Sequence, residues 1–482
     1  MNRRERPIFT LARLSSYISS CFILLAVAGL PSILSAQSQV QAEVKIGLIG
    51  DQTYSSDPAA SYRVLAEAAR IVKEQKVDAV IHTGDLVEST GEEEKVRAEF
   101  AQATGILNEI GKPWHLAPGD HDVDPPKFEP DSQDDSRKRL YYDFYHAHEP
   151  KLSSGLWHSF DVGEYHFVAL NSQERFHVDP RWGDVFLSGI SKEQLSWLKQ
   201  DLAAHRRAKG IVVFLHQPLW YNWAWWAPVH AVLRDYPVRA VIAGHFHYDQ
   251  DEGEIDHIHY LVMGATGADT KHADRTSGGI GEVAVLTLRN GAAEARLIPL
   301  DGGGPLEFTP RIDMDRVQAL HVILWELYRF GDNNQLCAEG GRIYGTGKTT
   351  PQLALAPVGN PIDLPVRLSV AIASDGKFAL QDARFVSDSC RSVSADGDCT
   401  LAPGARVQIS NNSLVTLSGD EKHPLAPLWQ AGLSLKPGLT AQPGDVVTLT
   451  VRLAFGDGRQ THWVESSATS NLSACASPGP GL

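Results

Sequence analysis

The sequence has little positive charge. Its 482 residues include 44 Lys and Arg against 58 Asp and Glu, which gives a formal net charge of −14. The first 36 residues carry four Arg and one Glu, so the rest of the chain is more acidic still, at about −17 by the same count. Because nucleic-acid backbones are held mainly by Lys and Arg, this balance argues against a protein that coats DNA or RNA.

Long apolar runs are also scarce. The stretch 17–34 follows a basic start and is interrupted by serines and a proline, whereas a membrane-spanning helix needs about 20 apolar residues. Residues 34–36 (Leu-Ser-Ala) then offer a small-residue cleavage site. We therefore expect residues 1–36 to be a cleaved signal peptide, and the protein to be periplasmic or secreted with no stable membrane span. An uncleaved N-terminal membrane anchor is the alternative.

Cysteine is rare and unevenly placed. Of five cysteines, Cys21 lies in the N-terminal segment, and the other four lie in the last third of the chain, at Cys337, Cys390, Cys399 and Cys475. An even number in an exported chain indicates two disulfides. Among three connectivities, Cys390–Cys399 as a local loop with Cys337–Cys475 as a tie between the domain's ends is favoured. No two of the four have zinc-ribbon spacing, so a structural metal is not expected among them.

The sequence has no repeat of fixed period, and its length suits two domains with buried cores. From residue 43 to about 300, short apolar runs alternate with stretches of helical periodicity. The expected strands are 44–50, 78–82, 210–215 and 238–243, and the expected helices are 61–75, 92–110 and one starting at a capping box in 191–194. This alternation indicates an α/β layered domain.

The sequence pattern changes after residue 300. A Gly-rich linker at 301–305 precedes one helical stretch at about 317–328. Beyond it, β-branched runs such as 365–373, 405–409 and 444–455 are separated by turn residues. Short strands of this kind predict a second, mainly β domain over 310–482, built as a small sandwich.

Acidic residues and histidines follow several expected strands. The clusters are Gly50-Asp51, Gly84-Asp85, Gly119-Asp120-His121-Asp122, His216, and Gly244-His245-Phe246-His247. Singly, each is explained by a turn or a buried histidine, but the ordered set is improbable by chance. Ligands gather at the carboxyl ends of strands in α/β sheets, so these side chains should converge. Carboxylates with imidazoles suit Mn, Fe or Zn.

The ordered set resembles the calcineurin-like metallophosphoesterase family over about residues 44–299. The resemblance implies a four-layer αββα fold, within which 160–171 and 260–267 match the family's strands. It also implies hydrolysis of a small-molecule phosphomonoester or phosphodiester by a metal-activated hydroxide, outside the cytoplasm. The two ester classes are not separated by the sequence. Nor does the sequence indicate an oligomeric state or a role for the C-terminal domain.

Roles for individual residues follow from the resemblance. Asp85 would bridge two divalent metal ions, with Asp51 and His247 on the first and Asp120, His216 and His245 on the second. His121 would lie over the phosphate, to stabilise developing charge or protonate the leaving group, and Asp122 would orient His121. No residues are assigned to any other cofactor.

Two positions depart from the family pattern. Thr53 stands where the family has His, so the first metal lacks a nitrogen ligand. Unless Tyr54 or Glu88 compensates, the first metal is loosely held or only one metal binds. Asp120 stands where Asn is usual and adds negative charge. The missing histidine supports an alternative, a degenerate protein of the same fold that binds metal and ligand without turnover.

The substrate is the least specified part. Residues 219–226 hold five aromatic residues directly after His216 and are expected to form an aromatic wall beside the metals. The alternative is a hydrophobic loop packed on the C-terminal domain. Arg175, His177 and Arg181 lie in a loop and are candidate phosphate contacts, with solvated surface as the alternative.

Overall fold

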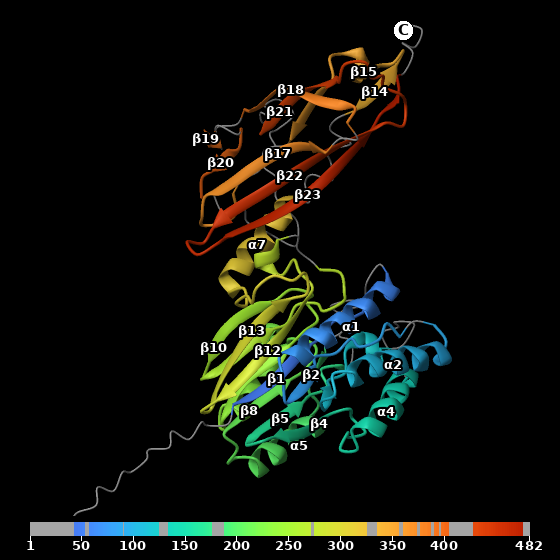
Figure 1. Cartoon of the computed structure of the whole chain (residues 1–482). Coiled ribbons are helices and arrows are strands. Elements are labelled where there is room, and N and C mark those ends of the chain that lie inside the picture. The colour runs from blue at the N-terminus through green and yellow to red at the C-terminus, as the bar shows by residue number, and fades with distance from the viewer. Residues whose placement is uncertain are drawn as a thin grey trace, which may run out of the picture. The chain divides into compact units, whose positions relative to one another are not determined.

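The computed structural model (Figure 1) describes most of the chain after residue 42. The described residues are 43–53, 57–89, 91–124, 134–175, 188–270, 274–324, 335–355, 360–373, 376–386, 390–394, 397–403 and 428–475. The expected signal peptide, Tyr54, His177, Arg181 and the strand at 405–409 lie outside them. Within the described residues, no helix has the length and apolar character to cross a membrane.

The first sheet contains five strands in the order β13-β12-β1-β2-β3. Their bounds are β1 Val44–Ile49, β2 Ala79–His82, β3 Trp114–Leu116, β12 Glu282–Arg289 and β13 Ala292–Pro299. Strands β1, β2 and β3 are parallel, and β12 runs antiparallel to β1. The parallel strands therefore present their carboxyl ends at one edge of the sheet.

The second sheet contains six strands in the order β10-β11-β9-β8-β5-β4. Their bounds are β4 His158–Val162, β5 Tyr165–Ala169, β8 Gly210–Phe214, β9 Val238–Ala243, β10 Gln250–Ile255 and β11 Ile258–Val262. Strands β5, β8, β9 and β11 are parallel. The strands expected from the sequence in both sheets are present within a residue or two of their predicted bounds.

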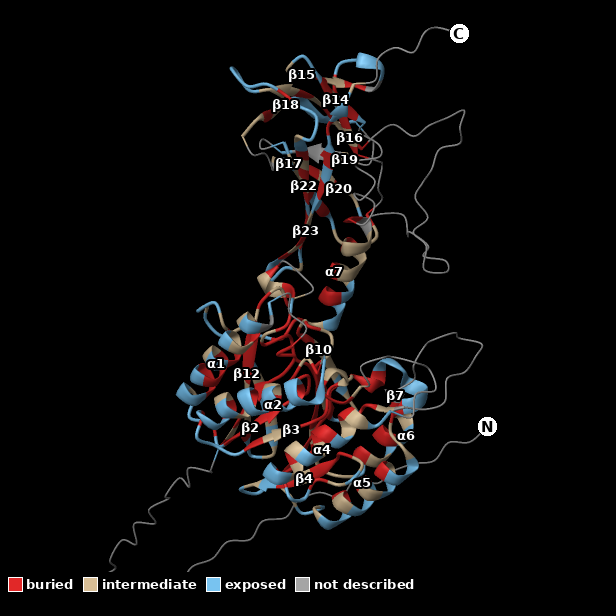
Figure 2. Cartoon of the chain, turned by 90° about the vertical axis from the view of Figure 1, so that its right-hand side faces the viewer, coloured by how far each residue is buried: buried red, intermediate tan, exposed pale blue. Residues whose placement is uncertain are grey.

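Helices cover the outer faces of both sheets, as Figures 1 and 2 show. The helices are α1 Pro58–Glu74, α2 Glu93–Asn108, α4 Ser136–His148, α5 Lys192–Ala204 and α6 Trp223–Leu233. One apolar cluster joins α1, α2 and α4 to the first sheet, and another joins α5 and α6 to the second. A third cluster fills the space between the sheets. This is the expected four-layer αββα arrangement.

Local sequence explains where the helices begin. Asp57 caps α1 by accepting a hydrogen bond from the Ala60 amide, and Ser191 caps α5 by accepting one from the Gln194 amide, as the capping box predicts. Helix α7 (Arg311–Leu324) begins six residues before the predicted start at 317. That prediction was wrong because most residues of the first turns are polar, although Met314 is buried there.

The C-terminal region is rich in β-structure. Three sheets contain the strands β14 Leu336–Glu339, β15 Arg342–Gly345, β16 Gln352–Leu355, β17 Val366–Ala373, β18 Phe378–Phe385, β19 Cys390–Val393, β20 Cys399–Leu401, β21 Trp429–Leu435, β22 Val446–Gly456, β23 Thr461–Asn471 and β24 Ser473–Ala474. One apolar cluster joins these sheets to α7. The two favoured disulfides, Cys337–Cys475 and Cys390–Cys399, are both present.

Candidate metal centre

Six acidic and histidine side chains lie where strands of the two sheets end. They are Asp51, Asp85 and Asp120 after β1, β2 and β3, and His216, His245 and His247 after β8 and β9. Because these strands end at the same edge of the two-sheet sandwich, residues nearly 200 positions apart in sequence come into contact. The His245 amide, for example, donates to the Asp51 carboxylate at 2.8 Å.

Asp120, His216 and His245 form one compact group. Nε2 of His216 lies 2.9 Å from Oδ1 of Asp120, and Nδ1 of His245 lies 3.1 Å from the same oxygen. One ligand atom from each of the three side chains lies within 4.8 Å of the others. Oδ2 of Asp85 lies 3.3 Å from Nε2 of His216, so Asp85 adjoins this group.

Asp51 and His247 form a second pair near Asp85. Asp51, Asp85 and His216 also offer ligand atoms within 4.8 Å of one another, and Nε2 of His247 lies 3.6 Å from Oδ1 of Asp51. Asp85 also shares a group of this kind with Asp120 and His121, so its carboxylate adjoins both Asp51 and Asp120. Its bridging of two cations stays a prediction.

The family model described as calcineurin-like phosphoesterase matches residues 44–249. The resemblance predicted from the motifs is therefore confirmed over these residues. A comparison with curated proteins found no match.

Several solved structures are similar to this chain at low identity. A dimetal phosphatase from Danio rerio is 15% identical over 55% of this chain and 98% of its own, with a TM-score of 0.41. A purple acid phosphatase from yellow lupin (Lupinus luteus) is 15% identical over 57% of this chain and 55% of its own, with a TM-score of 0.40. A 5'-nucleotidase from Candida albicans is 11% identical over 89% of this chain and 90% of its own, with a TM-score of 0.36.

Backbone carbonyls orient two histidines of the phosphoesterase domain. Nδ1 of His216 lies 3.0 Å from the Thr83 carbonyl oxygen, and Nδ1 of His247 lies 3.0 Å from that of Asp269. Each Nδ1–H therefore donates to a carbonyl, which leaves Nε2 to face the carboxylates. This is the arrangement usual for metal-bound histidine. Carbonyl partners have no sequence signature, so the sequence did not indicate them.

The phosphoesterase domain holds its acidic and histidine residues in an uncommon backbone conformation. Asp51, Asp85, His245 and His247 have φ values of 49°, 56°, 73° and 58°. Such left-handed positions cost about 1–3 kcal/mol each for residues with a Cβ, and they cluster at functional sites. Gly84 allows the close packing, because a Cβ there would lie 2.6 Å from Nδ1 of His216.

Thr53 does not replace the histidine expected at its position. It is buried, and its hydroxyl lies 3.3 Å from the Asp85 carbonyl oxygen, to which it donates. Glu88, the other residue considered as a compensating ligand, lies beside His121, with its Oε1 3.6 Å from Nδ1. Neither side chain contains nitrogen, so neither replaces the missing imidazole in the group formed by Asp51, Asp85 and His247.

Asp122 has contacts other than those expected. Its carboxylate accepts hydrogen bonds of 2.9–3.1 Å from four backbone amides, those of Asp85, Leu86, Val87 and Gly119. These amides occupy both of its oxygens, so Asp122 fixes the loop that presents Asp85. The carboxylates of Glu88 and Asp120 lie 3.6 and 4.0 Å from the ring nitrogens of His121. The expected role of Asp122 in orienting His121 stays a prediction.

His121 lies at the exposed side of the acidic cluster. Its backbone amide donates to Oδ1 of Asp85 at 3.0 Å, and its side chain is about a quarter exposed. Burial alone would lower the pKa of His121. The nearby carboxylates of Glu88, Asp85 and Asp120 outweigh burial and raise its pKa to about 9. Without added positive charge, His121 is therefore a cation and a proton donor at neutral pH.

The donor set fits divalent cations. Burial raises the pKa of Asp51 to about 7, whereas a cation beside it would favour the ionised carboxylate. Burial would also raise the pKa of Asp120, but hydrogen bonds from His216 and His245 hold it well below its usual range. The group around Asp120 offers four donors with Asp85, and the group around Asp51 offers three.

The aromatic segment after His216 is divided between core and surface. Trp220 and Trp226 are buried against Tyr260, whereas Tyr221, Trp223 and Trp225 are 42–45% exposed. The Tyr221 ring packs edge-on against Phe246, between His245 and His247 in sequence, with centroids 4.8 Å apart. The segment thus borders the metal centre.

The same segment also contacts α7. The Arg311 guanidinium lies 5.0 Å from the centre of the Tyr221 ring, which places a cation over its face. Both expectations for this segment therefore hold in part, because one aromatic residue lies beside the histidine motif and also packs on the first helix of the C-terminal region.

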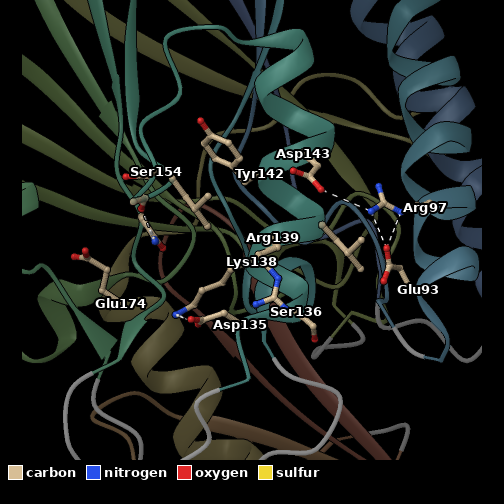
Figure 3. Close-up of a pocket in the computed structure, with 14 residues that line it drawn as sticks. Glu93, Arg97, Asp135, Ser136, Lys138, Arg139, Tyr142, Asp143, Ser154 and Glu174 are labelled. Atoms are coloured by element: carbon tan, nitrogen blue, oxygen red, sulfur yellow. Dashed lines mark hydrogen bonds and ion pairs between the residues drawn. The ribbon is translucent and has the colours of Figure 1, made fainter.

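A separate cavity of about 550 Å³ lies between α2, α4 and the end of β5 (Figure 3). Among its charged residues, Arg97 pairs with Glu93 and Lys138 pairs with Asp135. The residues that line it include none of the candidate ligands of the metal centre. We assign it no role in the reaction.

Proposed function

We propose that the protein hydrolyses a small-molecule phosphomonoester or phosphodiester outside the cytoplasm. The observation that carries the proposal is the position of Asp85, which offers a ligand atom within 4.8 Å of those of Asp51 and His216 and of those of Asp120 and His121. A cluster of three buried or half-buried carboxylates is costly unless cations neutralise it. The domain boundaries, a signal peptide at 1–36, a phosphoesterase domain at 43–300 and a β-rich domain at 310–482, belong to this proposal.

Several residues of the chain have separate roles in the proposed hydrolysis. Divalent cations of the Mn, Fe or Zn type, when bound, would supply positive charge for the phosphate oxygens and lower the pKa of the attacking water. His121 binds a phosphate oxygen or donates a proton to the leaving oxygen, and Glu88 holds the imidazole in its charged form. Asp122 keeps the Asp85 loop in place, so that the bridging carboxylate does not shift during turnover.

The two groups of donors should differ in affinity. The group with Asp85, Asp120, His216 and His245 has two imidazoles and holds the tighter cation. The group with Asp51, Asp85 and His247 has one imidazole, and its cation exchanges more readily because Thr53 contributes no ligand nitrogen.

The location outside the cytoplasm rests on two features. The N-terminal segment has the composition of a signal peptide, and the C-terminal region has two disulfides, which persist in oxidising compartments. An N-terminal membrane anchor is the alternative location.

The exposed aromatic side chains supply the substrate preference. Tyr221 borders the histidine motif, and Trp223 and Trp225 continue the surface along α6. A planar leaving group, such as an aromatic alcohol or a nucleobase, would stack on these rings. The preference is tested by the ratio of kcat/KM for aromatic and alkyl phosphoesters, which Tyr221→Ala should lower. Leu202→Met, on the buried face of α5, serves as the control.

Hydrolysis is distinguished from binding alone by two matched chromogenic substrates. The protein is loaded with Mn²⁺ or Zn²⁺ and tested on p-nitrophenyl phosphate and bis(p-nitrophenyl) phosphate. Turnover of one in preference to the other assigns the ester class. If metal binds and neither ester nor a wider phosphoester panel is hydrolysed, the non-catalytic alternative, favoured by Thr53, replaces the proposal.

A further inference from the structure

A second group of metal-ligand side chains lies away from the catalytic residues. His115 in the middle of β3, His158 at the start of β4 and Glu149 at the C-terminal end of α4 each offer a ligand atom, all within 4.8 Å of one another. Strands β3 and β4 are the last strands of the first and second sheets, respectively. The cluster therefore joins the edges of the two sheets to the end of a helix.

The three side chains are almost removed from solvent. His158 is 1% exposed, and the side chains of His115 and Glu149 are 12% and 11% exposed. The His115 ring stacks on Phe160 with centroids 3.3 Å apart, which fixes its plane. A buried imidazole and carboxylate need partners for their polar atoms.

Two ring nitrogens in the cluster lack such partners. Nδ1 of His158 and Nδ1 of His115 are buried, and neither makes a hydrogen bond within the described part of the chain. Nδ1 of His115 lies 3.2 Å from Oε2 of Glu149, close in distance but without hydrogen-bond alignment. Two ligands of one tetrahedral cation lie about this far apart, since metal–nitrogen and metal–oxygen bonds are about 2.0–2.2 Å long.

We propose that His115, Glu149 and His158 bind a divalent transition-metal ion of the zinc type, in a structural site separate from the catalytic centre. Two imidazoles and a carboxylate leave one coordination position for water. The cation would hold together two sheet edges that no further strand covers among the described residues.

The surrounding residues favour the protonation state that a metal needs. Nε2 of His158 lies 3.3 Å from the Tyr145 hydroxyl, whose oxygen accepts from the Leu116 amide. With Nε2–H donated to that oxygen, Nδ1 keeps a lone pair for the metal.

Glu149 supplies the carboxylate of the cluster. Its Oε1 accepts a hydrogen bond of 3.1 Å from the Lys151 amide, and its Oε2 faces Nδ1 of His115 at 3.2 Å. Without a cation, the two imidazole nitrogens remain unsatisfied.

The test counts metal ions in a chain whose catalytic centre cannot bind them. Asp85→Asn with His216→Ala removes the two side chains that join both catalytic groups. After equilibration with Zn²⁺ and gel filtration, elemental analysis should find about one zinc per chain, and adding His158→Gln should abolish it. His230→Gln, which replaces a buried histidine hydrogen-bonded to Tyr260 and Asp256, should leave it bound.

A second variant distinguishes the loss of the zinc site from misfolding of the protein. Glu149→Gln keeps the size of a side chain at the helix end and should lower zinc affinity at least tenfold with an unchanged circular dichroism spectrum. Cobalt should show tetrahedral absorption bands in the catalytic double variant and lose them with Glu149→Gln. No bound zinc in the catalytic double variant, or zinc retained after both cluster substitutions, would overturn the proposal. Hydrolysis is measured separately on chains with an intact catalytic centre, so the two proposals fail independently.

Discussion

At the scale of single residues, the catalytic centre depends on side chains that the backbone holds at some cost. Four of the six candidate ligands occupy left-handed backbone positions, and three carboxylates crowd into a buried space. Both features destabilise the fold by themselves, and a bound cation offsets the second. A bound cation should therefore raise the stability of the domain.

Thr53→His should strengthen the weaker cation site. The imidazole would supply the missing nitrogen ligand, and we expect the dissociation constant of the second-bound Mn²⁺ to fall about tenfold, or about 1.4 kcal/mol. Calorimetric titration of the metal-free protein measures it. Thr53→Val removes the hydroxyl bond to Asp85 without adding a donor and should give no gain. Equal affinities in the wild type and Thr53→His would show that the hydroxyl position is not a ligand position.

The metal-free protein should lose stability as pH rises from about 5 to 8. Burial raises the pKa of Asp51 to about 7 in the fold, above the unfolded value of about 4. A protonated Asp51 carboxyl therefore stabilises the fold at low pH, and this contribution is lost as pH passes the folded pKa. The melting temperature in EDTA should fall over this range, and Mn²⁺ should restore it at pH 8. A melting temperature that rises over the same range would contradict the account.

At the scale of elements, both groups of candidate metal ligands depend on the loop after β2, which carries Asp85. Four amides from two loops converge on the Asp122 carboxylate, and Asp85 projects from the centre of this arrangement. Loss of this acceptor should displace the bridging carboxylate rather than change the protonation of His121.

Asp122→Asn should therefore change stability but not the pH profile, whereas Glu88→Gln should change the pH profile but not stability. Asp122→Asn leaves amides without acceptors and should cost about 3 kcal/mol of unfolding free energy, with the pH profile unchanged. Glu88→Gln should leave stability nearly unchanged but move the alkaline limb of kcat/KM about one unit toward acid, because the pKa of His121 falls. Urea unfolding and pH–rate profiles measure both. A shifted pH limb in Asp122→Asn would support the role first expected for Asp122.

The sequence indicated the strands and the candidate ligands, but not the contacts that hold these side chains. Gly-Asp and His-x-His after apolar runs carry a pattern, so the positions of Asp85 and His245 were predictable. The carbonyls of Thr83 and Asp269 have no side-chain signature, and the contact of Glu88 with His121 depends on the path of a loop. The cluster of His115, Glu149 and His158 was missed because its members are scattered singly over 44 positions without a motif.

At the scale of the whole molecule, the cysteine pairs stabilise the C-terminal region to different extents. The partners are 138 residues apart in Cys337–Cys475 and 9 apart in Cys390–Cys399. In the chain-entropy treatment, loops of these lengths correspond to about 5 and about 3 kcal/mol. The two ends of the region thus depend on the long-range bond.

Cys337→Ser with Cys475→Ser should destabilise the C-terminal region by about 2 kcal/mol more than Cys390→Ser with Cys399→Ser. Both double variants should keep metal-dependent hydrolysis, because all the candidate catalytic residues precede residue 250. Urea unfolding followed by the fluorescence of Trp429 and Trp463 compares the stabilities. Equal losses in the two variants would mean that native packing, rather than loop closure, sets the effect.

Phosphoester hydrolysis by the metal-depleted chain, followed while Mn²⁺ or Zn²⁺ is returned, examines the whole account with one measurement. The account predicts no turnover after chelation, recovery with the added transition metal, and no recovery in Asp85→Asn, which lacks the shared carboxylate. Hydrolysis that persists in EDTA, or that survives Asp85→Asn at full rate, would contradict it.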